Sequence, residues 1–432
     1  MPAVVGMMVM SLYNVIDRIF IGQGVGADAI AGLAITFPVM NLSAAIGVLI
    51  GVGASARMSI LLGRKDQRSA EFILGNSLTL TLVNAVIYLA IFTIFIDDIL
   101  VAFGASPNSL PYARDFMLYI IPGLLMTNLT YNLNNVMRAS GYPTRAMVTM
   151  FIGAIANVIL APIFIFGLDM GIKGAAIASD ISMTISGAFV LAHFMSKKST
   201  VHFTRGTYRL RWKIVAAIIS IGAAPSIVNA VNCLINILIN KTLFRYGGDS
   251  AVAAVGIFTT FTQLLSSAVL GICQGAQPII GFNFGARHFD RLRAGYKLSM
   301  ITCMSICLLG SAVGVIFPEA IARMFTSDVY LIHVASRGIR IALLMFWSAG
   351  FQISSTNMFQ SIGKAGKSIF LSLTRQVIFF IPIILILPDF IGLEGVWFTF
   401  TISDSLAAMV TLFMVIWQFR QIRRWESLNS NL

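Results

Sequence analysis

Apolar runs of about 20 residues recur along the whole chain, and no other feature restricts its fold as much. An α-helix needs about 20 apolar residues to cross the ~30 Å hydrocarbon core of a bilayer. Of the 432 residues, 57% are hydrophobic and only 11% are charged, well below the charged share of soluble domains. We therefore predict an all-α polytopic membrane protein, because the runs are too long for the strands of a membrane β-barrel.

Twelve membrane spans are predicted from these runs. Lys and Arg concentrate in the loops after the even-numbered spans and in the C-terminal tail, while the opposite loops are short and often acidic, as in "FIDDIL" and "GLDMG". Because basic residues mark cytoplasmic loops, we expect both termini to be cytoplasmic. The approximate spans are 2–21, 33–61, 73–96, 113–137, 146–167, 173–195, 214–244, 252–284, 297–317, 329–361, 369–387 and 395–419.

The net charge of +13 raises the question of a nucleic-acid partner. The basic residues lie in short loops between apolar segments rather than along one face. We interpret the charge as an orientation signal for membrane insertion. The expected partners are a lipid bilayer and small amphipathic organic substrates, with no nucleic acid, and we expect a monomer.

An internal repeat relates the two halves of the chain. The stretch "VGASARMSILLGRKD", which begins at Val52, matches "QGAQPIIGFNFGARH", which begins at Gln274, and Gly141 matches Gly363 at the same offset of 222 residues. Each repeat holds six spans, so both halves enter the membrane the same way up. We predict twelve helices in two six-helix lobes, related by a pseudo-two-fold axis along the membrane normal, with a cavity between them.

The predicted domain boundaries follow from this repeat. Residues 1–196 form the N-terminal lobe, and the basic stretch 197–213, "KKSTVHFTRGTYRLRWK", is a cytoplasmic linker. Residues 214–419 form the C-terminal lobe, and 420–432 are a cytoplasmic tail.

Few ionisable residues lie well inside a predicted span, and Asp17 is the first of them. Tyr13 and Asn14 are four and three residues before it, so the three side chains share one face of an apolar helix. Asp180 and Asn157 fall at a comparable depth, in the outer half of the N-terminal lobe. A charge at the centre of the bilayer is costly unless it faces a partner or water.

Two interpretations of Asp17 stay open at this point. Removal from water favours the neutral form of an acid, so Asp17 would exchange a proton near neutral pH and respond to a proton gradient. The alternative is an ion pair that pins helices together, with Arg18 or another cation. The same two interpretations apply to Asp180.

The C-terminal half carries its polar residues at different places. The candidates for a site in the C-terminal lobe are Gln274, Gln277, Arg375, Gln376 and Asp404. A contact between Arg375 and Asp404 is one arrangement that the sequence allows, although it does not establish it.

Neither catalytic nor nucleotide-binding motifs are present in the sequence. The four histidines show no HExxH motif or other ligand spacing, there is no Walker loop, and the four cysteines lie inside apolar segments. We expect no enzyme activity, no cofactor and no resident metal. An ion gradient is then the expected power source.

Several stretches resemble the multidrug and toxic compound extrusion (MATE) family, along essentially the whole chain. They include "YNVIDRIFIGQGVG", "LNNVMRASGYPTRAM", "ANVILAPIFIFGLDMGIKGAAIAS", "GICQGAQPIIGFNFGA" and "GVWFTFTISD". The chain is most similar to the bacterial branch that includes proton-linked exporters of cationic drugs. The resemblance implies two six-helix lobes and alternating access to a central cavity.

The resemblance also implies roles for individual residues. Asp17 matches the acid of the first helix, with polar support from Tyr13, and Asn134, Asn157 and Ser179 match further polar positions of the N-lobe pocket.

One departure from the family bears on the identity of the coupling ion. Similar transporters usually have an aspartate four residues after the helix-five asparagine, whereas this chain has Ala161 in "NVILAP". The pocket then holds Asp17 as its single acid, unless Asp180 replaces the missing one. Proton coupling is the favoured prediction, and sodium bound at Asp17, Asn157 and Ser179 is the alternative.

A second departure concerns the start of the chain. The family usually has a basic lead before the first-helix proline, which matches Pro2. We expect the native protein to begin earlier.

Together these observations predict a secondary antiporter in the bacterial cytoplasmic (inner) membrane that exports amphipathic, often cationic, compounds by alternating access. A flippase for lipid-linked precursors is a rival prediction, but it would need a strongly cationic cavity. A membrane scaffold or sensor that transports nothing is a further alternative.

Overall fold

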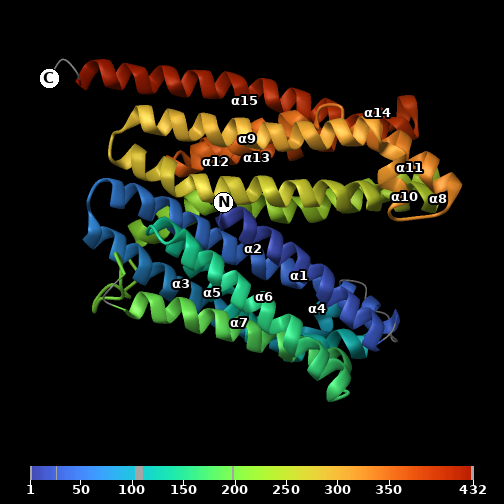
Figure 1. Ribbon diagram of the computed structural model, residues 1–432, viewed down its shortest axis with the longest axis horizontal. Coiled ribbons are helices and arrows are strands. Elements are labelled where there is room, and N and C mark those ends of the chain that lie inside the picture. The colour runs from blue at the N-terminus through green and yellow to red at the C-terminus, as the bar shows by residue number, and fades with distance from the viewer. Residues whose placement is uncertain (1, 26, 103–109, 197–198, 430–432) are drawn as a thin grey trace. The chain divides into compact units, whose positions relative to one another are not determined.

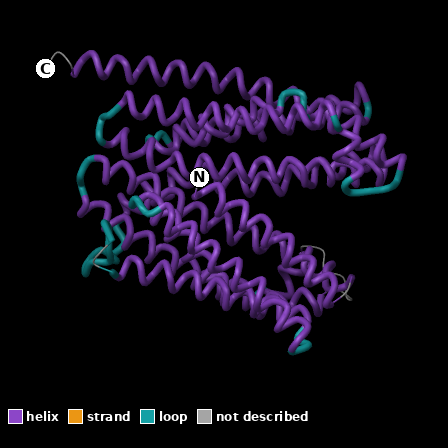
Figure 2. The backbone as a smooth tube through the Cα atoms, viewed as in Figure 1, coloured by secondary structure: helices purple, strands orange, loops and turns teal. Residues whose placement is uncertain are grey.

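The computed structural model describes residues 2–25, 27–102, 110–196 and 199–429, and for some of these, above all 21–35, it describes the backbone only. The described residues form helices joined by short turns, without any strand (Figure 2). In chain order the helices are α1 (Pro2–Val25), α2 (Ala27–Gly63), α3 (Gln67–Ile94), α4 (Ile96–Ala102), α5 (Leu110–Ala139), α6 (Pro143–Pro162), η1 (Ile163–Gly167), α7 (Gly171–Met195), α8 (Trp212–Gly285), α9 (Phe289–Ile316), α10 (Pro318–Arg323), α11 (Val329–Ala342), α12 (Phe346–Ser361), α13 (Ala365–Leu373), η2 (Thr374–Phe380), α14 (Ile381–Ile391) and α15 (Leu393–Asn429).

Ten described segments are long and apolar enough to cross a membrane. Helix α8 provides two of them, because Gly248 interrupts it with a φ of 64°. The pair α11 and α12 passes the same test when its two helices, bent by 51°, are taken together as one span, and Pro2–Tyr13 of α1 is a shorter apolar helix. The prediction of an all-α, multi-pass membrane protein is confirmed, and the twelve predicted spans fall on these helices. Such a fold satisfies its backbone hydrogen bonds within each helix, as the bilayer requires.

The chain divides into two compact units, Met1–Ala230 and Val231–Leu432. In Figure 1 the helices of the first unit run from blue to green, and those of the second run from yellow to red. The internal repeat is visible in the starting residues of corresponding helices in the two units. Helices α3 and α9, α4 and α10, and α6 and α13 each begin 222 residues apart. The short helices α4 and α10 were not predicted, but they too obey the repeat.

Backbone turns repeat at the same offset. Lys65 and Arg287 have φ values of 61° and 60°, and Gly141 and Gly363 have values of 97° and 75°. A left-handed turn favours glycine because it has no Cβ. This explains why Gly141 and Gly363 match in the sequence.

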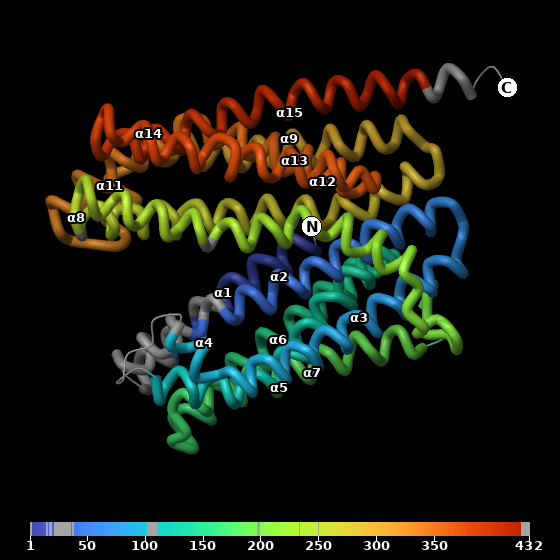
Figure 3. The backbone as a smooth tube through the Cα atoms, turned by 180° about the vertical axis from the view of Figure 1, so that it is seen from behind, coloured from blue at the N-terminus to red at the C-terminus, as the bar shows by residue number. Residues whose placement is uncertain are grey.

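Within the first unit, α5 packs against α2, α3 and α7 (Figure 3). Small residues allow this close approach. A Cβ atom on Gly51 of α2 would lie 3.0 Å from the Cα atom of Asn132 in α5. Gly47 and Gly51 lie four residues apart on α2, a spacing of small residues that permits close contact between membrane helices.

The stretch between α7 and α8 is bound to α3. Asn76 donates from Nδ2 to the carbonyl of Thr207 at 2.9 Å and accepts from the backbone N–H of Arg211 at 2.8 Å. Thr79 donates to the carbonyl of Tyr208 at 2.8 Å. The described part of this stretch is therefore packed on the first unit rather than extended away from it.

In the second unit, α9 packs against α12, and α15 packs against α11, α12 and α14. The ring of Trp397 on α15 is buried and lies edge-on to Phe258. A Cβ atom on Gly338 of α11 would collide with the Trp397 ring, so glycine allows α11 and α15 to approach closely. This core supports the polar residues of α15 and η2.

Candidate functional site

Helices α6 and α7 are joined by a polar contact within an apolar bundle. Asn157 of α6 is buried, and its Nδ2 donates to Oγ of Ser179 on α7 at 3.0 Å. The structure thus brings together two of the residues that the sequence proposed. An amide and a hydroxyl in contact inside a bilayer satisfy part of each other's hydrogen-bonding capacity.

Asp180, the next residue on α7, faces a different helix. Its carboxylate lies against Gly123 of α5 so closely that a Cβ atom there would overlap it. The backbone N–H of Gly123 donates to this carboxylate. Pro122 precedes Gly123 inside α5 and lacks an N–H, so the helix ladder is already interrupted at this turn. Ser179 and Asp180 therefore contact α6 and α5, respectively.

Asp180 is half-buried and has no cation within ion-pair distance in the part of the chain that the structure describes. Lys173, the basic residue nearest to it along α7, pairs with Asp115 at 3.0 Å instead. The carboxylate of Asp180 therefore accepts a hydrogen bond from Gly123 but has no described cation to balance its charge.

Helix α1 packs against α6 and α7. Tyr13 is buried there, with 8% of its surface exposed. The side chains of Asp17 and Asn14 lie outside the described residues, although the backbone of both belongs to α1. The helix that carries Asp17 is thus a direct neighbour of the two helices that carry Asn157 and Asp180.

Asn134 lies in a separate cluster. Its Nδ2 donates to the carbonyl of Ala146 at 2.8 Å, and its Oδ1 accepts from Nη1 of Arg138 at 2.6 Å. Asn135 accepts from Nη2 of Arg138, also at 2.6 Å. Arg138 itself is buried. The signal that would have found this cluster is the spacing of three and four residues between the asparagines and Arg138.

Ala161 is fully buried among apolar residues that include Ile165 of η1 and Ile172 of α7. The place where similar transporters have a second acid is therefore part of the apolar core. Asn157 lies one helical turn away and keeps its contact with Ser179. No described contact joins Asp180 to Asn157.

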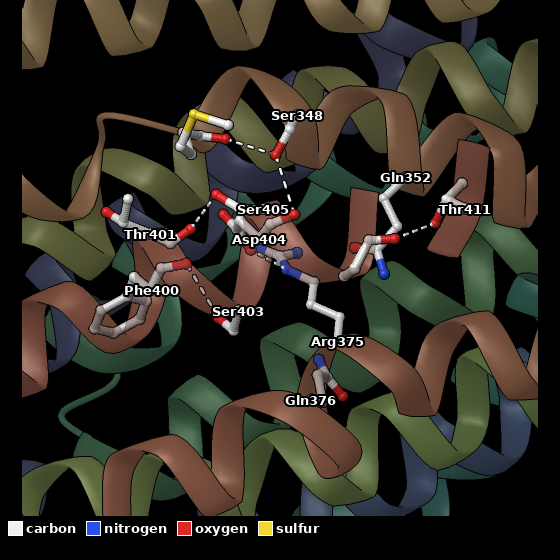
Figure 4. Close-up of polar contacts among 12 residues, drawn as sticks. Ser348, Gln352, Arg375, Gln376, Phe400, Thr401, Ser403, Asp404, Ser405 and Thr411 are labelled. Atoms are coloured by element: carbon white, nitrogen blue, oxygen red, sulfur yellow. Dashed lines mark hydrogen bonds and ion pairs between the residues drawn. The ribbon is translucent and has the colours of Figure 1, made fainter. Parts of the chain in front are cut away.

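The second unit holds an ion pair. Arg375 donates from Nε to Oδ1 of Asp404 at 2.6 Å, as Figure 4 shows. Only 4% of the Asp404 side chain is exposed, against 27% for Arg375. Arg375 lies at the start of the π-helix η2, and Asp404 lies on α15, which packs against η2. The contact that the sequence left open is present.

The three candidate glutamines of the second unit differ in their contacts. Gln376 donates from Nε2 to Oδ1 of Asn232 at 2.7 Å. One buried side-chain atom of each has no hydrogen-bond partner among the described residues: Oε1 of Gln274, Nε2 of Gln277 and Oε1 of Gln376. No described hydrogen bond links Gln274 or Gln277 to the Arg375–Asp404 pair.

The described residues include no group of three His, Cys, Asp or Glu side chains that would hold a metal ion. Cys273 and Cys303 are buried, with their sulfur atoms 4.0 Å apart. A sodium site at Asp17 cannot be built from the described side chains, because that of Asp17 is not among them.

The MatE family model matches the chain twice, over residues 2–163 and 225–386. The chain belongs to the MatE family. The predicted family is confirmed, and the two matches cover corresponding parts of the internal repeat. MatE proteins are membrane transporters rather than enzymes.

Curated and solved MatE relatives cover nearly the whole chain. The multidrug export protein MepA of Staphylococcus aureus (strain NCTC 8325 / PS 47) is 26% identical, over 96% of this chain and 91% of MepA. The MATE multidrug transporter DinF-BH, solved in complex with R6G, is 34% identical, with a TM-score of 0.90 over 98% of this chain and 94% of DinF-BH. An outward-facing multidrug resistance MATE family transporter of the MOP superfamily is 25% identical, with a TM-score of 0.92, over 98% and 95% of the two chains.

Proposed function

We propose that the protein is a secondary antiporter that exports amphipathic, often cationic, compounds in exchange for protons. The proposed proton sites are Asp17 and Asp180 in the first unit, supported by Tyr13, Asn14, Asn157 and Ser179. We place the protein in the bacterial cytoplasmic membrane, as a monomer with both termini in the cytoplasm.

One observation carries this proposal. Asp180 lies inside a membrane-spanning helix, in hydrogen-bond contact with Gly123, with no described cation beside it. A carboxylate without a counter-charge in the membrane changes its charge by gaining or losing a proton, and such acids mark proton pathways. The neighbouring contact of Asn157 with Ser179 and the packing of α1 on α6 and α7 place further polar groups close by.

The relatives support the substrate class. MepA is named as a multidrug export protein, and DinF-BH was solved with the dye R6G. This chain contains 21 Met and 32 Phe, and those that line a transport route would contact amphiphiles of different shapes, since apolar contact has no preferred direction.

The proposed cycle uses the acids of the first unit as a charge switch. In the ionised state they favour binding of a cationic compound from the cytoplasm. Entry of protons from the outside neutralises them and changes the hydrogen bonds of α1, which lowers the affinity for the cation and releases it outside. Binding of the proton and of the cation then exclude one another, as antiport requires.

Efflux from energised vesicles tests this proposal. Inverted vesicles that contain the wild-type protein should take up a fluorescent permanent cation when a proton gradient is imposed, but not with a sodium gradient alone. Asp17→Asn and Asp180→Asn should reduce this uptake, whereas Asp115→Asn, a matched change in an exposed ion pair, should not. Uptake that follows the sodium gradient, or that both carboxamide variants leave unchanged, would remove the proton assignment.

A further inference from the structure

The second unit exposes a charged group at mid-membrane depth. Arg375 lies ten residues after Ala365, where its span begins, which corresponds to roughly 15 Å along the helix. More than a quarter of its side chain is accessible, since 27% is exposed. A guanidinium at this depth is costly in hydrocarbon, so an accessible one faces protein or water rather than lipid tails.

The residues next to Arg375 show that η2 has an apolar face and a polar face. Val377 and Ile378 are exposed apolar side chains, as expected for contact with lipid tails. Gln376 instead bonds to Asn232 of α8, an exposed amide within the same unit. Figure 4 shows Gln376 next to Arg375 on η2, away from the residues of α15. Arg375, Gln376 and Asn232 thus provide a polar, accessible part of the second unit.

The guanidinium of Arg375 makes its hydrogen bond within the described part of the protein through Nε alone. Nε donates to Asp404, and the terminal groups Nη1 and Nη2 have no hydrogen-bond partner in the described part of the chain. These two groups form the planar fork that binds a carboxylate through two parallel hydrogen bonds. On the next residue, Oε1 of Gln376 is a buried acceptor that has no partner in the described part of the chain.

Asp404 holds the fork in place. Its side chain is buried, and its backbone carbonyl accepts a hydrogen bond from Oγ of Ser348 at 3.3 Å. Arg375 sits in a π-helical turn, and π-helical turns occur frequently at functional sites. The ion pair therefore fixes the guanidinium before any ligand arrives, which lowers the entropy cost of binding.

We propose that Arg375, oriented by Asp404, binds the carboxylate of a transported amphiphile. The favoured ligand is a zwitterion. Asp404 already neutralises the charge of Arg375, so a single additional carboxylate is tolerated, particularly when the ligand brings its own cationic group. A phosphate or pyrophosphate would place two or more negative charges next to Asp404, so the site selects carboxylate over these groups. The transport part rests on the proposed function, whereas the binding part does not.

Two dyes that differ in one group test the inference. Rhodamine B carries a free carboxylate, and its ethyl ester is a permanent cation with the same aromatic system. Binding of each dye to the purified full-length protein in detergent is measured by fluorescence anisotropy. The readout is the ratio of the two dissociation constants, because a general loss of folding or of apolar contact changes both alike.

The variant Arg375→Gln/Asp404→Asn removes both charges and leaves no unpaired buried ion. We expect the dissociation constant of rhodamine B to rise about tenfold relative to that of its ethyl ester, as for the loss of a charge-assisted, bidentate pair. Arg375→Lys keeps the charge but lacks the fork, and we expect a smaller shift in the same direction. Gln418→Asn, remote from the pair and bonded to Lys367, is the control and should not alter the ratio.

An unchanged ratio in a double variant that still binds both dyes would overturn the inference. Vesicle uptake of the same two dyes separates this result from the proposed function. If the ratio depends on Arg375 but neither dye is transported, the binding site stands and the antiporter proposal fails. If the ester is transported and the ratio does not depend on Arg375, the antiporter proposal stands alone.

Discussion

The two units contain half-buried or buried aspartates in opposite electrostatic situations. Asp180 in the first unit contacts the backbone of Gly123 and has no described cation, whereas Asp404 in the second unit is paired with Arg375. The offset of 222 residues places Asp180 over Ile402 and Asp404 over Ser182, so the helices repeat but the acids do not. The duplicated fold therefore holds one aspartate without a described counter-charge and one that is held in an ion pair.

The largest expected effect concerns the stability of the second unit. Asp404→Asn leaves Arg375 without its counter-ion, and breaking such a buried pair costs about 3 kcal/mol. Thermal unfolding in detergent should show a marked drop in the melting temperature. Arg375→Gln/Asp404→Asn should recover most of the loss, because no unpaired charge remains. Equal stability of the single and double variants would show that the pair is not what stabilises this region.

A transport defect of about tenfold or more is expected for Asp17→Asn, because a carboxamide cannot carry the proton that the proposed cycle requires. The measurement is the initial rate of proton-driven uptake of a fluorescent cation in inverted vesicles. Asp17→Glu keeps an acid at this place and should retain part of the rate. Comparable rates for the carboxamide and the wild type would contradict the role of Asp17.

Asp180→Asn should have a smaller effect, about fivefold on the same rate, because the carboxamide keeps the hydrogen bond with Gly123 but not the charge. The variant should also flatten the dependence of uptake on external pH. The matched change Asp115→Asn lies in an exposed ion pair and should leave the pH profile as it is. A wild-type pH profile in Asp180→Asn would place proton exchange elsewhere.

The smallest effect is expected for Gly123→Ala. The added methyl group overlaps the Asp180 carboxylate, which turns away because it is the end of a flexible side chain. We expect a loss of about 1 kcal/mol in stability, at the lower end of the cost of overpacking, together with a shift of the pH profile of uptake. In the double variant Gly123→Ala/Asp180→Asn the pH shift should disappear. A shift that persists there would show that Gly123 acts independently of Asp180.

Much of the fold was predictable, for reasons specific to membrane helices. Long apolar runs give the spans directly, and residues such as Gly141 and Gly363 occupy left-handed turns that few other residues adopt. The exceptions are the short helices α4 and α10 and the π-helices η1 and η2. A π-helical turn shifts the register of all following side chains, and apolar composition does not reveal it.

The candidate site was less predictable because its contacts depend on the rotation and packing of neighbouring helices. Sequence position placed Ser179 and Asp180 together, yet they contact α6 and α5, respectively. The spacing of Arg138 from Asn134 and Asn135 allows the contacts between them, but it does not show that Arg138 is buried. The Arg375–Asp404 contact joins residues on separate spans, which sequence spacing alone does not establish.

The most direct test is to count the protons that the purified protein releases when it binds a permanent cation, by calorimetry in buffers with different ionisation enthalpies. Acids of the first unit that are protonated before binding must ionise as the cation arrives, so we predict measurable proton release by the wild type. Asp17→Asn and Asp180→Asn should each diminish it, and the double variant should abolish it. Proton release that persists in the double variant, or that disappears only with Arg375→Gln/Asp404→Asn, would contradict the account.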